Sequence, residues 1–155
     1  MANFSSTGSD TFPIYHVLAT KALTIVPGST YTTSASAPAA IDATNLSITH
    51  TTTHASNRLI FTVASKWMKS DNQLFWNIAK STAITTNLFP QSFIYWRSAD
   101  QGGECVQFSA AISGSDSSTT YQWTHYNENN STTVYSNYSE FSGHMSFKLE
   151  EVQYV

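Results

Sequence analysis

The chain has 155 residues, of which only 11% are charged, and its formal net charge is −3. This length suits one domain, and folding buries roughly 70% of the surface that an unfolded chain of this size exposes. We expect no nucleic acid partner, because the charge balance provides no basic patch, and no membrane span, because no apolar run approaches the required length.

The composition favours β-structure. Ser and Thr make up more than a quarter of the chain, and there are four Trp, eight Tyr and nine Phe. β-Branched and aromatic residues fit a pleated, half-buried surface, so an all-β fold is predicted.

The first part of the chain is predicted to be an arm followed by strands. Residues 1–12 are small and polar and are expected to form a flexible arm, with one domain over 13–155. The arm lacks a basic region followed by an apolar run, so we expect no signal peptide and synthesis in a host cytoplasm. A loosely alternating strand then ends at Pro27-Gly28, and another strand is expected over 29–36.

Two strand patterns follow. In ATNLSITHTT, alternation places Leu46, Ile48 and His50 on one face. LIFTVASKW (59–67) is the clearest strand, because it is β-branched and aromatic over nearly its whole length.

The centre of the chain alternates between strands and turn formers. SDN (70–72) is expected to turn the chain, and QLFWNIAK (73–80) and SFIYWRS (92–98) are predicted strands. ADQGG (99–103) is expected to form a tight turn before the strand ECVQFSAAI (104–112).

The last part of the chain alternates most regularly. In TTYQWTHYNE, Tyr121, Trp123 and His125 share one face, and a short strand is expected near Val134. The closing segment MSFKLEEV alternates apolar and polar residues over 145–152. About eight or nine short strands separated by turns indicate an antiparallel sandwich or barrel, without a convincing helix.

Several strands carry large apolar residues on both faces. LIFTV, LFWNI and FIYW are examples, whereas an antiparallel sandwich with one solvated face should alternate. We therefore predict that the second face is a subunit interface, the alternative being that loops cover these strands. The residues assigned to this interface are Trp67, Phe75, Trp76, Tyr95, Trp96 and Phe147.

The order of these segments resembles a known family. SNRLIFTVASKW opens a strand after a turn, TTYQWTHY follows late in the chain, and MSFKLEEV closes it. Over roughly residues 29–152 the chain resembles the trimeric jelly-roll domains of tailed-phage virion proteins, which are similar in architecture to C1q and tumour-necrosis-factor domains. The resemblance implies a jelly-roll β-sandwich that forms a homotrimer on the virion surface and catalyses no reaction.

Two roles fit such a domain. With no coiled coil or collagen-like run before the first strand, we favour a capsid decoration (cement) protein that binds the major capsid protein and stabilises the shell. The alternative is a receptor- or carbohydrate-binding head domain of a tail fibre or spike, because exposed aromatic rings stack on sugars. The residues considered for ligand or capsid contact are Tyr126, Tyr135 and Tyr138.

Catalytic and metal chemistry find little support in the sequence. No nucleophile elbow, phosphate-binding loop, zinc-protease or dinucleotide pattern occurs, so we expect no enzymatic activity, catalytic residue or cofactor; a glycosidase built from scattered carboxylates stays open. Glu150 and Glu151 are adjacent on a strand and should point to opposite faces. His50 and His54 would lie about 13 Å apart in an extended strand, so no metal site is expected unless a trimer axis gathers three copies. Cys105 is expected to be a buried apolar side chain.

Overall fold

The computed structural model describes most of the chain. The described residues are 16–25, 30–65, 68–89, 94–102, 106–115, 117–127, 133–137 and 144–153. The arm predicted over 1–12 and Cys105 lie outside them. Within them, the expected all-β class is confirmed, and the helical content is one 3-10 turn, η1 (Ser81–Ala83). In the same residues, no helix has the length and apolar character needed to cross a membrane.

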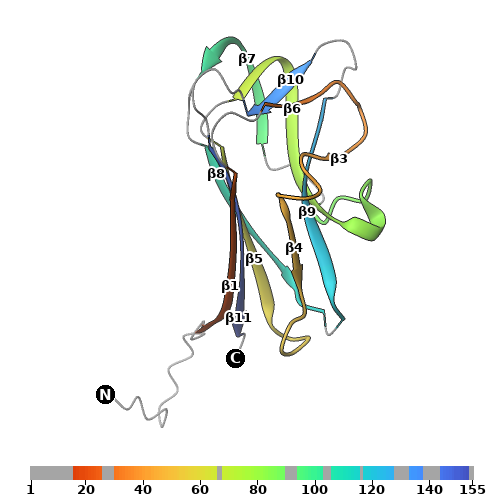
Figure 1. Cartoon of the computed structure of the whole chain (residues 1–155), viewed down its shortest axis with the longest axis vertical. Coiled ribbons are helices and arrows are strands. Elements are labelled where there is room, and N and C mark those ends of the chain that lie inside the picture. The colour runs from red at the N-terminus through yellow and green to blue at the C-terminus, as the bar shows by residue number, and fades with distance from the viewer. Residues whose placement is uncertain are drawn as a thin grey trace, which may run out of the picture.

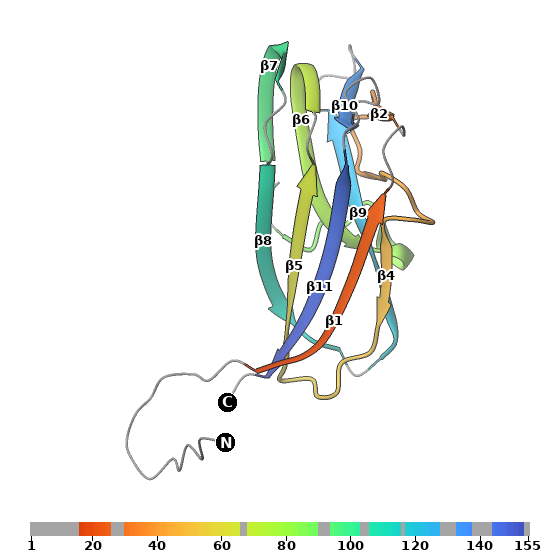
Figure 2. The same cartoon turned by 60° about the vertical axis from the view of Figure 1, so that its left-hand side comes forward.

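The first sheet contains four antiparallel strands. Their order is β1 (His16–Ile25), β11 (Met145–Gln153), β5 (Arg58–Ser65) and β8 (Val106–Ser113). The first described strand therefore pairs with the last described one, and β1 forms one edge of the sheet in the described residues (Figure 2).

The second sheet is organised around β6 (Met68–Lys80) and β9 (Thr119–Asn127), which pair with each other. β7 (Ile94–Gly102) lies beside β6, and β4 (Ser47–His50) pairs with β9. Three short strands extend this sheet: β2 (Tyr31–Thr33), β3 (Ala39–Ala40) and β10 (Val134–Asn137).

The longer-range pairing is nested. β1 pairs with β11, β4 with β9, β5 with β8, and β6 with β7, so the chain folds like one long hairpin wrapped on itself. Of the strands that open these pairs, β1 and β5 lie in the first sheet, and β4 and β6 lie in the second. Figure 1 shows the two layers facing each other.

The core lies between the sheets. β5 and β11 alternate buried and part-exposed residues, as their sequences predict. The ring centroids of Phe61 on β5 and Tyr121 on β9 lie 5.0 Å apart, which joins the two layers directly. Burying each such side chain contributes about 1.5–3 kcal/mol, so these contacts hold the sheets together.

Two predicted turns are strands in the structure. β6 continues through Ser70–Asn72, and its pairing with β7 shifts register on both sides of Ser70. β7 likewise continues through Ala99–Gly102. Irregular pairing of this kind accommodates turn-forming residues inside a strand, so their presence did not end either one.

Candidate functional site

A buried carboxylate closes one end of the sandwich. The inward-facing residues of β11 are apolar until Glu151, which is 0% exposed. Glu150 next to it is part-exposed, so the two carboxylates point to opposite faces, as expected. An apolar alternation that ends in a carboxylate places a charge where the two sheets meet.

Four hydrogen bonds satisfy this carboxylate. The backbone N–H and the hydroxyl of Thr53 donate to Oε1 at 2.7 and 2.8 Å, and Nδ2 of Asn57 donates to the same oxygen at 2.7 Å. Nε2 of His50 donates to Oε2 at 2.8 Å. His50 comes from β4, and the other two donors come from the β4–β5 loop, so the carboxylate links both sheets through the loop that caps them.

Hydrogen bonding decides the charge of Glu151. Burial alone raises the pKa of a carboxyl, but the donors from Asn57, Thr53 and His50 outweigh it and lower the pKa of Glu151 from 4.5 to about 2. Glu151 is therefore an anion at neutral pH, even though its side chain is enclosed.

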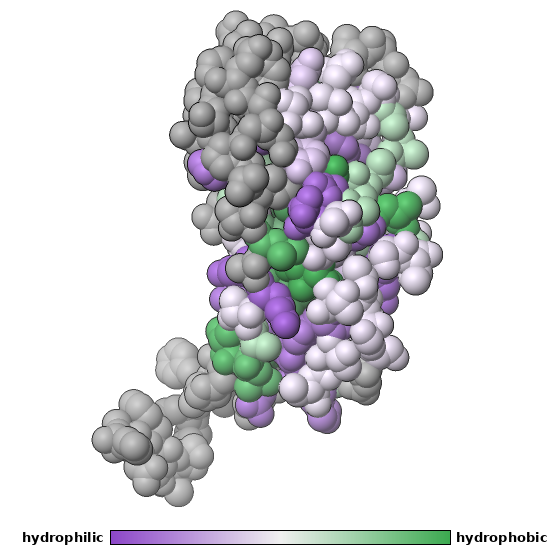
Figure 3. Space-filling model, in the orientation of Figure 1, coloured by the Kyte–Doolittle hydropathy of each residue, from purple (hydrophilic) through white to green (hydrophobic). Residues whose placement is uncertain are grey.

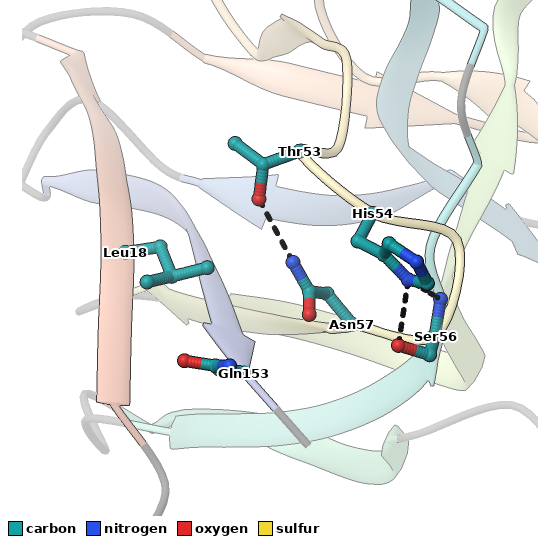
Figure 4. A pocket seen from close by; sticks show the side chains of 6 residues that line it. All are labelled: Leu18, Thr53, His54, Ser56, Asn57 and Gln153. Carbon is teal, nitrogen blue, oxygen red and sulfur yellow. Dashed lines mark hydrogen bonds between the residues drawn. The ribbon is translucent and has the colours of Figure 1, made fainter. Parts of the chain in front are cut away.

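A pocket of about 320 Å³ lies beside this network, since Thr53 and Asn57 are among the residues that line it (Figure 4). β1 and β11 contribute one side of it, and the β4–β5 loop contributes the other. Its lining side chains carry hydroxyl, amide, imidazole and isobutyl groups: Leu18, Thr53, His54, Ser56, Asn57 and Gln153.

The backbone beneath the pocket is held by a close approach. The N–H of Gly114 donates to the carbonyl of Asn57 at 2.7 Å. A Cβ at position 114 would lie 2.5 Å from Cγ2 of Thr52 and 2.9 Å from the Asn57 carbonyl oxygen. Only glycine therefore allows β8 to end this close to the loop.

The two histidines considered for metal binding have separate partners. His50 bonds Glu151, and Nδ1 of His54 bonds Ser56. In the described part of the chain, no three His, Cys, Asp or Glu residues are grouped as a metal ion would need.

A second polar network is buried between β6, β9 and β10. Nε1 of Trp76 donates to the hydroxyl of Ser136 at 2.8 Å, and that hydroxyl bonds Nδ1 of His125 at 2.8 Å. Burial lowers the pKa of His125 from 6.5 to about 4. Ser136 and His125 are 0% and 3% exposed, so this serine–imidazole pair has no open side for a substrate.

The predicted interface residues fall into three groups. The prediction was wrong for Trp76 and Phe147, because both are 0% exposed and pack in the core of the subunit. Phe75 is half-buried on β6. Trp67 lies outside the described residues, and for Tyr95 and Trp96 only their places on β7 are described.

Few large apolar groups are exposed among the residues whose side chains the structure describes. The exposed large hydrophobic side chains there are Val17, at 55%, and Leu18, at 45%, both on β1. Figure 3 shows one face of the molecule, where green hydrophobic areas are small and lie among hydrophilic ones. The large side chains of β5 and β6 whose exposure is described mostly point inward, and the exposure of the β7 side chains is not described, so the interface stays a prediction.

Two of the three tyrosines predicted for contacts, Tyr126 and Tyr135, lie on strands. The ring of Tyr126 on β9 stacks on Phe75, with centroids 4.8 Å apart and an interplanar angle of 11°. Tyr135 pairs with Thr32 of β2, and Tyr138 lies outside the described residues.

Sequence reasoning missed both polar networks. One signal was available for the first: Glu151 occupies an inward position of an otherwise apolar alternation. The second network gave no such signal in the sequence, because Ser136 lies in a polar segment where hydroxyl residues are common.

Comparison of the chain with protein-family models finds no matching family, and comparison with curated proteins finds no matching relative.

Proposed function

We propose that this chain is a non-catalytic structural protein of a tailed-phage virion, which decorates the capsid surface as a homotrimer. It would bind the major capsid protein and stabilise the shell, because a partner that binds only the assembled state favours that state. The nested pairing of β1 with β11, β4 with β9, β5 with β8 and β6 with β7 is the observation that carries the proposal.

The nested pairing supports a jelly roll. Without the short strands β2, β3 and β10, the sheets run β1-β11-β5-β8 and β4-β9-β6-β7. Numbered along the chain, these are strands 1-8-3-6 and 2-7-4-5, an order that supports the proposal of a double-sheet jelly roll, an architecture of viral capsid and lectin domains. The assignment to a virion rests on the resemblance of the sequence, since a fold by itself does not define a function.

The stack of Phe75 and Tyr126 is the favoured subunit contact. Both rings are half-buried in the single chain, and they lie side by side on the outer face of the second sheet. Burying both rings against a second copy would remove apolar surface from water.

Light scattering tests the oligomer. We expect a mass three times that of the subunit at micromolar concentration, and a lower mass when Phe75 and Tyr126 are both replaced by Ser. Ser146→Ala, on the first sheet, is the matched control and should leave the mass unchanged. A monomeric wild-type protein would contradict the proposal.

Capsid binding requires its own experiment. Purified protein is added to heads that lack it, and the temperature at which the heads release their DNA is measured. Binding at a fixed number of copies with a higher release temperature supports a cement role. Heads that bind no protein, or whose release temperature does not change, contradict it.

A receptor- or carbohydrate-binding head domain is the second candidate. The half-exposed ring of Tyr126 favours it, because an aromatic face held by stacking can contact a sugar ring. A glycan array probed with wild-type protein and with Tyr126→Ala separates this role from the first: binding lost in the variant supports it, and no binding by either protein refutes it.

A further inference from the structure

We propose that the pocket between β1, β11 and the β4–β5 loop binds a neutral, hydroxyl-rich ring, such as one sugar residue. Asn57, His54 and Leu18 are the residues that recognise it. This inference does not depend on the virion role, and the β4–β5 loop that lines the pocket lies at the opposite end of the sandwich from β10 (Figure 1).

Asn57 presents a fixed acceptor. Its Nδ2 donates to Oγ1 of Thr53 at 2.9 Å and to Oε1 of Glu151 at 2.7 Å. An ionised carboxylate can only accept, so the amide nitrogen must face Glu151, and Oδ1 must point away from it. Figure 4 shows this oxygen on the side of Asn57 away from Thr53. Asn57 is only 3% exposed, and its backbone carbonyl accepts a hydrogen bond from the N–H of Gly114. Its side-chain Oδ1 is therefore positioned before a ligand arrives.

His54 presents a fixed donor. The backbone N–H of Ser56 donates to Nδ1 of His54 at 3.1 Å, and the Ser56 hydroxyl lies 2.8 Å from the same nitrogen. A nitrogen that accepts from a backbone N–H carries no proton, so the neutral ring bears its hydrogen on Nε2. His54 is exposed, and this N–H is available to a ligand hydroxyl.

The rest of the lining determines the ligand class. Leu18 is 45% exposed and offers an apolar contact for the C–H face of a ring. Gln153 adds an amide that can donate and accept. None of the six lining residues is a carboxylate or an ammonium, and the charge of Glu151 behind them already receives four hydrogen bonds. Paired donors and acceptors beside one apolar group suit a neutral hydroxylated ring better than an ion.

The volume agrees with a small ligand. At about 320 Å³ the pocket is at the lower end of the range for small-molecule sites, so one ring fits better than an extended chain. We expect dissociation constants in the millimolar range, because few contacts surround the ligand.

The test is an NMR titration of the isotope-labelled full chain with glucose, galactose, mannose and N-acetylglucosamine, with sodium acetate as an ionic probe. At least one sugar should cause saturable shifts of the His54 ring, the Leu18 methyl groups and the Asn57 amide, and acetate should not. His54→Ala should weaken that binding at least tenfold, whereas Thr82→Ala, an exposed substitution in η1, should leave it unchanged.

Three results would overturn the inference. They are the absence of saturable shifts with every sugar, equal binding by wild type and His54→Ala, and acetate binding in place of the sugars. Gln153→Ala provides a second variant that needs no change in the buried network, and it should weaken binding less than His54→Ala does. None of these results bears on the oligomer mass, which tests the virion role.

Discussion

The two buried polar networks hold their ionisable groups in different charge states. At the pocket end, Glu151 is fully enclosed and yet keeps its charge, because four donors converge on one carboxylate. Between β6, β9 and β10, His125 is similarly enclosed but has one described side-chain partner, the hydroxyl of Ser136. Burial lowers the pKa of His125 to about 4, so the ring stays neutral.

The difference shows what decides the state of an enclosed ionisable group. Burial disfavours the charged form in both networks, and the number of hydrogen bonds made to the charged form determines whether it survives. The pocket-end network links the two sheets through a loop that can supply several donors. The second network lies beside the packed rings of Trp76 and Trp123, and the hydroxyl of Ser136 is shared between Trp76 and His125.

Removing the carboxylate should give the largest effect. Glu151→Leu leaves the donors of Thr53, Asn57 and His50 without their acceptor, and breaking a buried ionic network of this kind costs about 3–5 kcal/mol. Urea denaturation measures the loss in the free energy of unfolding. Glu150→Leu is the matched control, because its ion pair with Lys148, at 2.9 Å, is part-exposed and contributes about 1 kcal/mol or less. Equal losses in the two variants would show that the hydrogen bonds to Glu151 contribute little.

Removing the shared hydroxyl of the second network should cost slightly less. Ser136→Ala leaves both Nε1 of Trp76 and Nδ1 of His125 without the partner described here, so we expect a loss of about 3 kcal/mol. Ser146→Ala, at a part-exposed position of β11, should change the free energy of unfolding by about 0.5 kcal/mol or less. A loss that small in Ser136→Ala would show that the second network does not contribute to stability.

Adding a methyl group at Gly114, where the backbone approaches the β4–β5 loop, should cause the next largest loss of stability. Gly114→Ala forces Thr52 or the Asn57 carbonyl to move, so we expect a loss of about 2–3 kcal/mol and shifted NMR signals for the β4–β5 loop. Ser113→Ala, its exposed neighbour on β8, should cause neither change. Unshifted loop signals in Gly114→Ala would contradict the description of this contact.

The smallest predicted effect is a pH dependence of the free energy of unfolding, which falls in a different pH range for each network. The pKa of His125 is lower in the folded chain than its ordinary value of 6.5, so the unfolded chain binds the proton more readily. Stability should therefore be complete above pH 6.5 and fall as the pH drops toward 4, with a loss of about 2 kcal/mol at pH 5. The contribution of Glu151 is lost in a lower window, between pH 4.5 and 2.

Denaturation as a function of pH checks this separation. His125→Asn should flatten the dependence between pH 6.5 and 4 and leave the lower window in place. A wild-type slope in His125→Asn would mean that another group controls this range.

Local patterns predicted the faces of the regular strands. Alternation placed Leu46 and Ile48 on one face, and it placed Tyr121 and Trp123 together as well; all four are buried. The same reasoning failed in the middle of the chain. Phe75 and Trp76 are consecutive large apolar residues, and nothing in their order tells which one points into the core.

The sequence by itself determined the all-β class, the main strands and the opposite orientation of Glu150 and Glu151, because a period of two is a local property. Only the tertiary structure decided that Glu151 is an enclosed anion and that a pocket lies beside it. The partners of Glu151 are separated from it by 94 to 101 positions. Wrapping the nested hairpin brings them together, and a contact over such a separation leaves no periodic pattern in the chain.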